Sequence, residues 1–444
     1  MDKKVYTISY GCQMSERDSE TLTAISTKLG YSRTEDLSQA DLVIINTCCV
    51  RESAENKIIG KIGQLKKIKE KKPSLVIAVA GCMVQQPGIL ERLQKRAPHV
   101  DIWTGTFDHN KFEELLHASL CGRKIALISQ REIDVSEVVP LAEKGKLHVN
   151  VNIMYGCNNY CAYCIVPYVR GRERSRPKEV ILDEVRSLVE SGCREVTLLG
   201  QNVNSYGKTD GFGYDFSDLL KAMDKVDGLF RVRFMTSHPK DLSDKLITTV
   251  AEGEHLCEHF HLPFQAGSNR VLQMMNRYYT REYYLERVHR ILDEIPEARL
   301  TTDIIAGFPG ETEEDFEQTL DLVRTVPFTQ AFTFMYSKRS GTAAADFPDQ
   351  IPLEIKKLRL QKLMGLQNTR SLAWRNEMVG HNCEILVEGP SKSNAELLTG
   401  RTRGNELVVF QGNEHLIGSL INVRIDSANS WTLFGRIEFP KERR

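Results

Sequence analysis

The sequence predicts an α/β protein with an open parallel α/β sheet at the N-terminus, a central partial (β/α)6 barrel and a small C-terminal β-barrel. Two patterns support this prediction. Continuous apolar runs alternate with amphipathic helical segments to about residue 340, which is typical of parallel strands covered on both faces. From 381 to 439 the pattern changes to short strands with Gly and Asn turns, which is typical of a small barrel.

The expected domain boundaries follow these changes of pattern. A length of 444 residues suits about three domains. We expect an N-terminal domain at 1–125, a barrel domain at 147–372 and a C-terminal domain at 375–440. The acidic, weakly periodic segment at 126–146 is predicted to be a linker.

Three strand-like runs define the expected N-terminal sheet: KKVYTISYG, DLVIINT and SLVIAVAG. The segment SERDSETLTAISTKLG has a helical pattern, with Ser15 as the expected N-cap and Gly30 as the expected stop. Because strands and helices alternate, the carboxyl ends of the strands should converge on one crevice.

Six further strand-like runs form the expected central barrel, namely LHVNVNIM, EVTLLG, FRVRFMT, EHFHLP, ARLTTDIIA and TQAFTFMY. Helical patterns separate them, for example at 178–191, 241–252, 281–294 and 311–325. Six units are fewer than the eight of a closed barrel, so we expect this one to be open on one side. One long amphipathic helix should follow and end at Gly380.

Composition limits the class of protein. The formal net charge is zero, so no overall field attracts nucleic acid and any such binding needs local patches. The start MDKKVYTISYGCQ lacks the features of a signal peptide, and the longest apolar run is too short to span a bilayer. We therefore expect a cytoplasmic protein without a membrane partner, whose eleven cysteines stay reduced.

The segment GCNNYCAYC places Cys157, Cys161 and Cys164 at a C-x3-C-x2-C spacing. Three thiolates leave a metal site one ligand short. One interpretation is a zinc site whose fourth ligand comes from elsewhere, for instance His148, Cys193 or His255. The other is an iron–sulfur cluster that keeps one iron open for a substrate.

This spacing, directly after the first strand of a partial barrel, resembles the radical S-adenosylmethionine (SAM) enzymes, with Tyr163 at their aromatic position. The resemblance implies that the open iron binds SAM and that a reduced cluster cleaves it to a carbon radical. It also implies SAM contacts from the loops that follow the strands. The expected cofactor-binding residues are Tyr163, Asn202, Ser237, Gln265 and Asp303.

A second set of cysteines follows the three N-terminal strands. Cys12, Cys48 and Cys82 lie in YGC, NTC and AGC, each at or close to the end of a strand. Because such ends converge in an open α/β sheet, the three thiols should meet and could hold a second cluster with one open iron. The alternative is three separate buried cysteines.

Motifs across the whole chain resemble the methylthiotransferases, a family of radical SAM enzymes. These motifs are YGCQMSERDSE, INTCCVRESAENK, GCMVQQ, YGCNNYCAYCIVPYVRGRERSRP, SHP and MNRYYTRE. Two positions depart from the pattern: Cys49 replaces a small residue, and Ala266 replaces a common Ser. Cys48 is the cysteine in register with the family motif and is therefore the expected ligand.

The resemblance implies a function. The motif NTC-x-VRE-x-AE-x-K resembles most one branch of this family. The enzymes of that branch insert sulfur and a methyl group at C2 of N6-isopentenyladenosine, next to the anticodon of tRNA. It implies SAM, two [4Fe-4S] clusters held by the six cysteines, and no further catalytic side chain. The expected partners are that tRNA, an electron donor such as flavodoxin or ferredoxin, and a sulfur source, with the enzyme as a monomer.

Other functions stay open at this point. The same chemistry could act on threonylcarbamoyladenosine in tRNA or on an aspartate of a ribosomal protein. From a different class, the chain could be a non-catalytic metal-binding RNA adaptor. An adaptor would not cleave SAM, and the ribosomal-protein enzyme would ignore tRNA.

Arginines mark the expected RNA contacts. YVRGRERSRPKE follows the cysteine loop, where guanidinium groups could hold backbone phosphates near the chemistry. The C-terminal barrel resembles the RNA-binding TRAM domain, and its GRTRGN turn is also basic. The candidate RNA-binding residues are Arg170, Arg172, Arg174, Arg176, Arg401 and Arg403.

Overall fold

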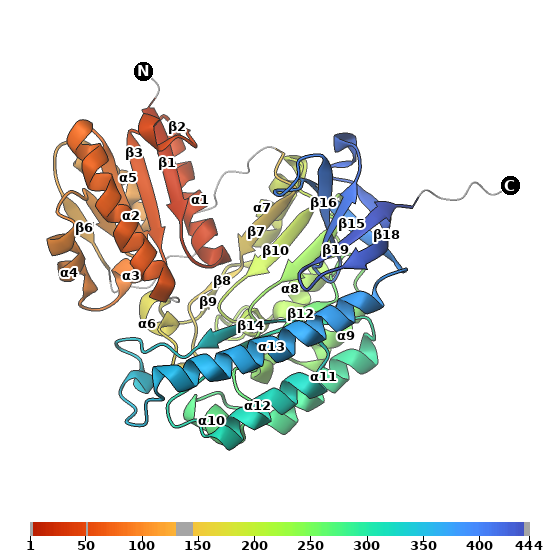
Figure 1. Ribbon diagram of the computed structural model, residues 1–444. Coiled ribbons are helices and arrows are strands. Elements are labelled where there is room, and N and C mark those ends of the chain that lie inside the picture. Colours follow the sequence, from red (N-terminus) through yellow and green to blue (C-terminus); the bar gives the residue numbers. More distant parts are fainter. Residues whose placement is uncertain (1–2, 50–51, 130–144, 439–444) are drawn as a thin grey trace.

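The computed structural model describes residues 3–49, 52–129 and 145–438 and confirms the predicted fold class (Figure 1). An N-terminal α/β unit, a central open barrel and a C-terminal β-barrel follow one another along the chain. Most of the predicted linker, 130–144, lies outside the described residues. No helix in the described ranges is both long and apolar enough to cross a membrane.

The N-terminal sheet has six parallel strands in the order β2-β1-β3-β4-β5-β6. Three of them were expected, and three were missed because runs of three residues are too short to show a pattern. The last of these, β6, lies partly in the predicted linker. The strands are β1 (Lys3–Ser9), β2 (Tyr31–Arg33), β3 (Leu42–Thr47), β4 (Val76–Gly81), β5 (Ile102–Thr104) and β6 (Ile125–Leu127).

Both faces of this sheet are covered by helices (Figure 1). Alternate residues of β3 enter different apolar cores, with Val43 and Ile45 on one face and Leu42 and Ile44 on the other. The N-cap prediction was wrong: the N-cap of the first helix is Cys12, and Ser15 is buried inside the first turn. The helices are α1 (Gln13–Lys28), α2 (Glu52–Lys71), α3 (Cys82–Gln85), α4 (Ile89–Arg96) and α5 (Phe112–Leu120).

The central unit contains the six expected parallel strands, in two three-stranded sheets with the orders β11-β10-β7 and β12-β13-β14. A single isolated β-bridge, Val232 to Leu256, joins β11 to the residues before β12. We call this junction the seam. The strands are β7 (His148–Asn152), β10 (Glu195–Leu199), β11 (Arg231–Phe234), β12 (His259–His261), β13 (Arg299–Ala306) and β14 (Phe328–Met335).

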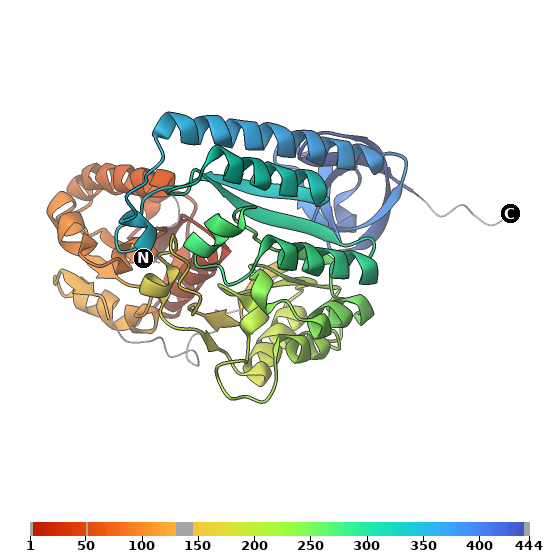
Figure 2. The same ribbon diagram turned by 90° about the horizontal axis from the view of Figure 1, so that it is seen from below.

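Helices line the outside of the central unit, and Figure 2 shows the long α13, in light blue, ending at the C-terminal barrel. A large apolar core fills the space between helices and strands. The main helices are α7 (Lys178–Glu190), α8 (Phe216–Met223), α9 (Asp244–Glu252), α11 (Arg281–Glu294), α12 (Glu313–Thr325) and α13 (Leu353–Glu377). Shorter elements are β8 (Met154–Tyr155), α6 (Val166–Arg170), β9 (Arg174–Ser175) and α10 (Asn269–Met274).

The C-terminal unit is a closed barrel with strand order β15-β16-β17-β19-β18. It packs against the amino ends of the central strands, since Arg231 of β11 and Arg299 of β13 form ion pairs with Glu384 and Glu406. The carboxyl ends of the central strands lie on the opposite side, where the cysteine loop follows β8. The strands are β15 (Asn382–Pro390), β16 (Leu397–Thr402), β17 (Leu407–Gln411), β18 (Leu420–Ala428) and β19 (Thr432–Ile437).

Candidate functional site

The loop with the C-x3-C-x2-C motif follows β7 and β8 at the carboxyl end of the central strands. Gly156 begins it with φ 73°, and a Cβ there would lie 2.0 Å from the carbonyl oxygen of Arg172. Only glycine fits this close approach. Burial raises the pKa of Cys157 to about 11, and burial followed by the neighbouring Cys161 raises that of Cys164 to about 12.

Raised pKa values keep these thiols protonated in the absence of a metal. They can still act as ligands, because a bound metal displaces thiol protons. Among the described residues, no three Cys, His, Asp or Glu side chains are close enough to hold one metal ion. Zinc would require each sulfur at about 2.3 Å from a single ion. A four-iron cluster gives each cysteine its own iron and therefore fits a wider spacing of sulfurs.

The three alternative zinc ligands lie at the opposite end of the barrel. His148 begins β7 and makes a 2.9 Å hydrogen bond to Thr197. Cys193 lies just before β10, and its thiol donates to the Leu147 carbonyl. His255 lies just before β12. None of them can therefore complete a site with the cysteine loop.

Arg277 is a site residue that the sequence analysis missed. Its guanidinium is buried and lies 3.4 Å from the sulfur of Cys161 and 3.3 Å from the Tyr163 hydroxyl. Burial opposes its charge, but Tyr163, Tyr279 and Cys161 outweigh that effect and raise the pKa of Arg277 well above its usual value. The motif MNRYYTRE contained this residue, but only the tertiary structure shows what it contacts.

The strand ends contain buried polar atoms without partners, which is a feature of a ligand site. The hydroxyl of Ser237 and Oε1 of Gln265 have no hydrogen-bond partner, and Gln265 has a positive φ of 67°. Asn202 is instead occupied, since it donates to Asp241 at 2.7 Å and accepts from the His238 amide.

The last two SAM candidates lie at the same carboxyl end. Asp303 of β13 lies 3.6 Å from His261 of β12, and Tyr163 lies in the cysteine loop itself. The five SAM candidates thus come from the ends of central strands and from the cysteine loop.

The second cysteine set also gathers at strand ends. Cys12 caps α1, Cys48 follows β3 directly and Cys82 follows β4 directly. The loop at Gly11 passes so close to Cys48 that a Cβ there would lie 2.5 Å from the Cys48 Cβ. The loops of Cys12 and Cys48 are therefore in contact.

Cys49 is hydrogen-bonded to Cys82. This hydrogen bond lowers the pKa of Cys82 to about 7 and raises the pKa of Cys49 itself well above its usual value. The choice of Cys48 over Cys49 as the metal ligand stays a prediction from the sequence.

Residues that follow the cysteine loop pack against cysteines of the N-terminal unit. Ile165 and Val169, which follow Cys164 in the chain, form one apolar cluster with Cys49 and Cys82. Arg170, at the end of α6, lies between Asp18 and the thiols of Cys82 and Cys12. Although burial opposes its charge, these groups raise the pKa of Arg170 well above its usual value.

A buried network of charged side chains docks the N-terminal unit onto the barrel. Glu184 of α7 pairs with both Arg17 of α1 and Arg176, the latter at 2.7 Å. Arg170 pairs with Asp18 of α1 at 2.6 Å. All five side chains are buried. This network holds the amino end of α1, and hence Cys12, against the barrel.

This network corrects the RNA-binding prediction for two residues. Arg170 and Arg176 do not reach the surface, because each is buried in an ion pair with a carboxylate. Phosphates therefore cannot reach them in this conformation. Arg172 is exposed and Arg174 is half-buried on β9, so the prediction stands for these two.

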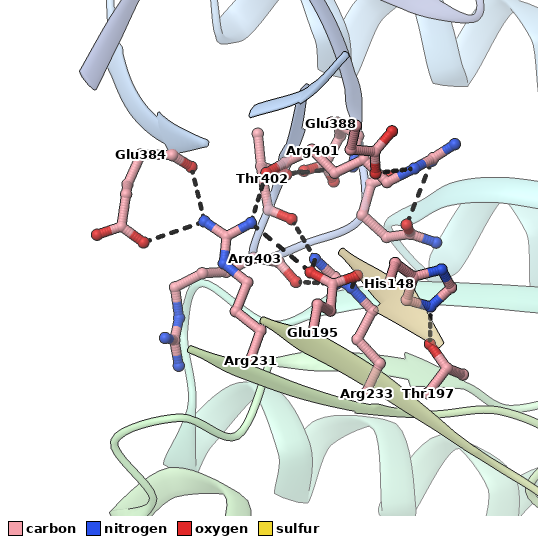
Figure 3. Close-up of polar contacts among 12 residues, drawn as sticks. His148, Glu195, Thr197, Arg231, Arg233, Glu384, Glu388, Arg401, Thr402 and Arg403 are labelled. Atoms are coloured by element: carbon pink, nitrogen blue, oxygen red, sulfur yellow. Dashed lines mark hydrogen bonds and ion pairs between the residues drawn. The ribbon is translucent and has the colours of Figure 1, made fainter. Parts of the chain in front are cut away.

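The two arginines of the GRTRGN turn are held by carboxylates, although their side chains are 37% and 29% exposed; Figure 3 shows Arg401 beside Glu388. Arg401 pairs with Glu388 at 3.0 Å, and Arg403 pairs with Glu258 of the central unit at 2.6 Å. Arg403 therefore serves the interface between units, whereas a surface role was expected.

Exposed aromatic side chains near the cysteine loop were also missed. Tyr160 and Tyr168 are exposed and stack edge to face, with ring centres 6.0 Å apart. Tyr278 is 65% exposed, and nearby Asn276 donates to the Tyr160 carbonyl. Tyr160, Asn276 and Tyr278 all have positive φ angles, a strained backbone that is common at functional sites.

Comparisons with known proteins identify the family. The family model of the Radical SAM superfamily matches residues 151–323. The model of Uncharacterized protein family UPF0004 matches 4–105, and that of the TRAM domain matches 376–437. A tRNA-2-methylthio-N(6)-dimethylallyladenosine synthase from Desulfitobacterium hafniense is 67% identical over 98% of this chain and 97% of its own length. The chain belongs to the radical SAM methylthiotransferase family. Synthases of the same name from Acetivibrio thermocellus and Carboxydothermus hydrogenoformans are 51% and 52% identical, covering 98% of this chain and 91% and 99% of their own.

Solved structures support the fold of this methylthiotransferase. The radical SAM methyltransferase TsrM from Kitasatospora setae matches with a TM-score of 0.55, at 13% identity over 75% of this chain and 73% of TsrM. The cobalamin-dependent SAM radical enzyme OxsB matches with a TM-score of 0.52, at 12% identity over 81% and 56%. Family membership implies SAM and a [4Fe-4S] cluster as cofactors.

We expect Arg277 to tune that cluster. Replacing Arg277 with Met removes a cation and a hydrogen bond from Cys161, so the reduction potential should fall, by on the order of tens of millivolts. Potentiometric titration of the reconstituted methylthiotransferase would measure this shift. Arg277→Lys, which keeps the charge, should move the potential less, and equal potentials in all three proteins would contradict the prediction.

Proposed function

We propose that this methylthiotransferase acts on tRNA and converts N6-isopentenyladenosine next to the anticodon into 2-methylthio-N6-isopentenyladenosine. Its relatives of 67%, 52% and 51% identity have the corresponding name. The observation that carries the proposal is that Ile165 and Val169, which follow the barrel cysteines, pack on Cys49 and Cys82 of the N-terminal unit. Insertion of sulfur requires a sulfur-bearing site beside a radical-forming site.

The barrel cysteines would hold one [4Fe-4S] cluster, and Cys12, Cys48 and Cys82 would hold a second. With SAM bound, the barrel cluster supplies a carbon radical able to remove hydrogen from the adenine C2, a position that acid–base chemistry cannot activate. Around it, Arg277 would fix the sulfur of Cys161 and Arg170 would offset negative charge near Cys12 and Cys82. The apolar residues Ile165 and Val169 would exclude water between the two sites.

The candidate SAM ligands keep their proposed roles. Ser237 and Gln265 have unpartnered buried oxygens, and Asn202, Asp303 and Tyr163 lie at the same strand ends. We expect Ser237 and Gln265 to gain partners when SAM binds.

The anticodon loop would be held by groups around the cysteine loop. Single-stranded nucleotides are recognised by stacking on aromatic rings, which Tyr160, Tyr168 and Tyr278 offer. The exposed Arg172 could contact a phosphate beside them. We further propose a cytoplasmic monomer that takes electrons from a flavodoxin or ferredoxin and sulfur from a separate source.

An anaerobic assay tests the proposed function. Reconstituted protein, SAM, a reductant and tRNA bearing isopentenyladenosine are incubated, and the digested nucleosides are identified by mass. We expect the 2-methylthio nucleoside together with 5′-deoxyadenosine, and neither product from Cys161→Ala. 5′-Deoxyadenosine without the modified nucleoside would instead indicate threonylcarbamoyladenosine or a ribosomal protein as the substrate. Neither product from protein with both clusters would contradict the proposal.

A further inference from the structure

The seam is the junction between neighbouring strands of the central barrel with the least backbone pairing. In the part of the chain that the structure describes, only one β-bridge, Val232 to Leu256, joins the two three-stranded sheets. The amide of Val232 donates to the His255 carbonyl at 2.8 Å, and the amide of Cys257 donates back to the Val232 carbonyl at 3.0 Å. Each of the other strand junctions in the barrel has at least three paired residues.

Residues 401–403, at and just after the end of β16 in the C-terminal barrel, contact both sides of this seam, and we call them the docking segment. Figure 3 shows its contacts with Arg231 and Arg233 on the first side. On the first side of the seam, Arg233 of β11 donates to the carbonyls of Thr402 and Arg403, both at 2.6 Å. Arg231 of β11 donates to the Arg401 carbonyl. Three backbone carbonyls of the docking segment are therefore bound to β11.

On the second side of the seam, the docking segment is bound through one side chain. The Arg403 guanidinium forms a bidentate ion pair with the Glu258 carboxylate, with N–O distances of 2.6 and 2.8 Å. It also donates to the carbonyls of Leu256, at 2.6 Å, and Glu254, at 3.0 Å. Leu256 is itself one half of the seam bridge.

The charges on the β11 side are fully buried and compensated. Arg231 has no exposed surface and Arg233 is 3% exposed. Glu195 of β10 accepts from Arg233 at 2.9 and 3.2 Å and lies 4.0 Å from Arg231. Buried guanidinium groups need such partners, so both cations are held in one orientation, aimed at the docking segment.

We propose that the docking segment closes the seam and fixes the C-terminal barrel at a set distance from the cysteine loop, so that Arg403 and Glu258 are positioning residues for tRNA. This rests on the proposed function. The eight residues of β13 span about 26 Å from the docked end to the carboxyl end. The C-terminal barrel would therefore hold a part of the tRNA well away from the reacting base, such as the phosphates of the anticodon stem.

Two variants test this proposal against direct phosphate binding. Arg403→Ala and Glu258→Ala should both raise the KM for full-length tRNA, by about tenfold for the loss of one charge-assisted contact. Neither should change the KM for a short anticodon-loop oligonucleotide or the cleavage of SAM without RNA. Both should speed hydrogen exchange of the amides of Val232 and Cys257. Arg287→Ala, which breaks a 2.8 Å pair with Asp244 between outer helices, is the matched control.

The sign of the Glu258→Ala effect decides between the two roles. If Arg403 binds phosphate directly, removing its acidic partner frees it, and the KM for tRNA should fall. That result, unchanged exchange at the seam, or an equal rise of KM for both RNAs would overturn the proposal. Wild-type protein that makes no methylthio nucleoside would refute the proposed function, while the exchange rates would still test closure of the seam.

Discussion

Replacing Cys48 with alanine is expected to abolish formation of the methylthio nucleoside while cleavage of SAM continues. Cys48 follows β3 directly and contacts the loop of Cys12, so its loss would leave the N-terminal site with two thiols. Two thiolates hold a four-iron cluster poorly. The variant should therefore lose about half of its iron and keep the cluster that cleaves SAM.

Cys49→Ser is the matched control for this experiment. The serine hydroxyl can still donate a hydrogen bond to Cys82, which is the contact that Cys49 makes. This variant should keep both clusters and most of its activity. Iron analysis, Mössbauer spectra and nucleoside digestion would compare the two variants. If Cys49→Ser lost the cluster and Cys48→Ala kept it, the assignment of ligands would be reversed.

Glu184→Ala should be among the most destabilising single changes in the chain. It removes the carboxylate that pairs with the buried Arg176 and leaves the buried Arg17 with Glu20 as its remaining acidic partner. Removing one partner of such a buried network typically costs about 3–5 kcal/mol. Because Arg17 is on α1, undocking should also separate Cys12 from the barrel. SAM cleavage would then continue while yield of the methylthio nucleoside falls.

Urea denaturation, followed by hydrogen exchange of α1 and α7, would measure this effect. Asp183→Ala on the same helix removes an exposed pair with Arg186 and should leave the midpoint almost unchanged. An unchanged midpoint for Glu184→Ala as well would show that the network does not dock the N-terminal unit.

The fold was largely predictable because its long strands are apolar throughout. β3 and β4 are buried at every position, so they appear as continuous apolar runs. The three-residue strands β2, β5 and β6 contain too little sequence to show any period. The seam could not be predicted from the sequence either, because it depends on how two sheets approach each other in the tertiary structure.

The candidate site was predictable where one residue type has few other uses. Six cysteines at strand ends and at a fixed spacing indicated two metal sites without any structure. Arg277 was missed because nothing in its sequence neighbourhood indicates a metal site, and only its 3.4 Å approach to Cys161 gives it a role. The burial of Arg170 and the ion pair of Arg403 could not be predicted, because sequence shows charge but not tertiary contacts, and their carboxylate partners lie 152 and 145 residues away.

The position of α1 has a consequence for how this protein stays in solution. Among the described strands β7 pairs only with β10, so its other edge faces the open side of the barrel. Unpaired strand edges attract other chains and lead to aggregation. α1 contacts β7 on this side, so the N-terminal unit acts as a cover for the barrel in addition to carrying cysteines. A barrel produced without it would present a bare edge and should precipitate at concentrations that the whole chain tolerates.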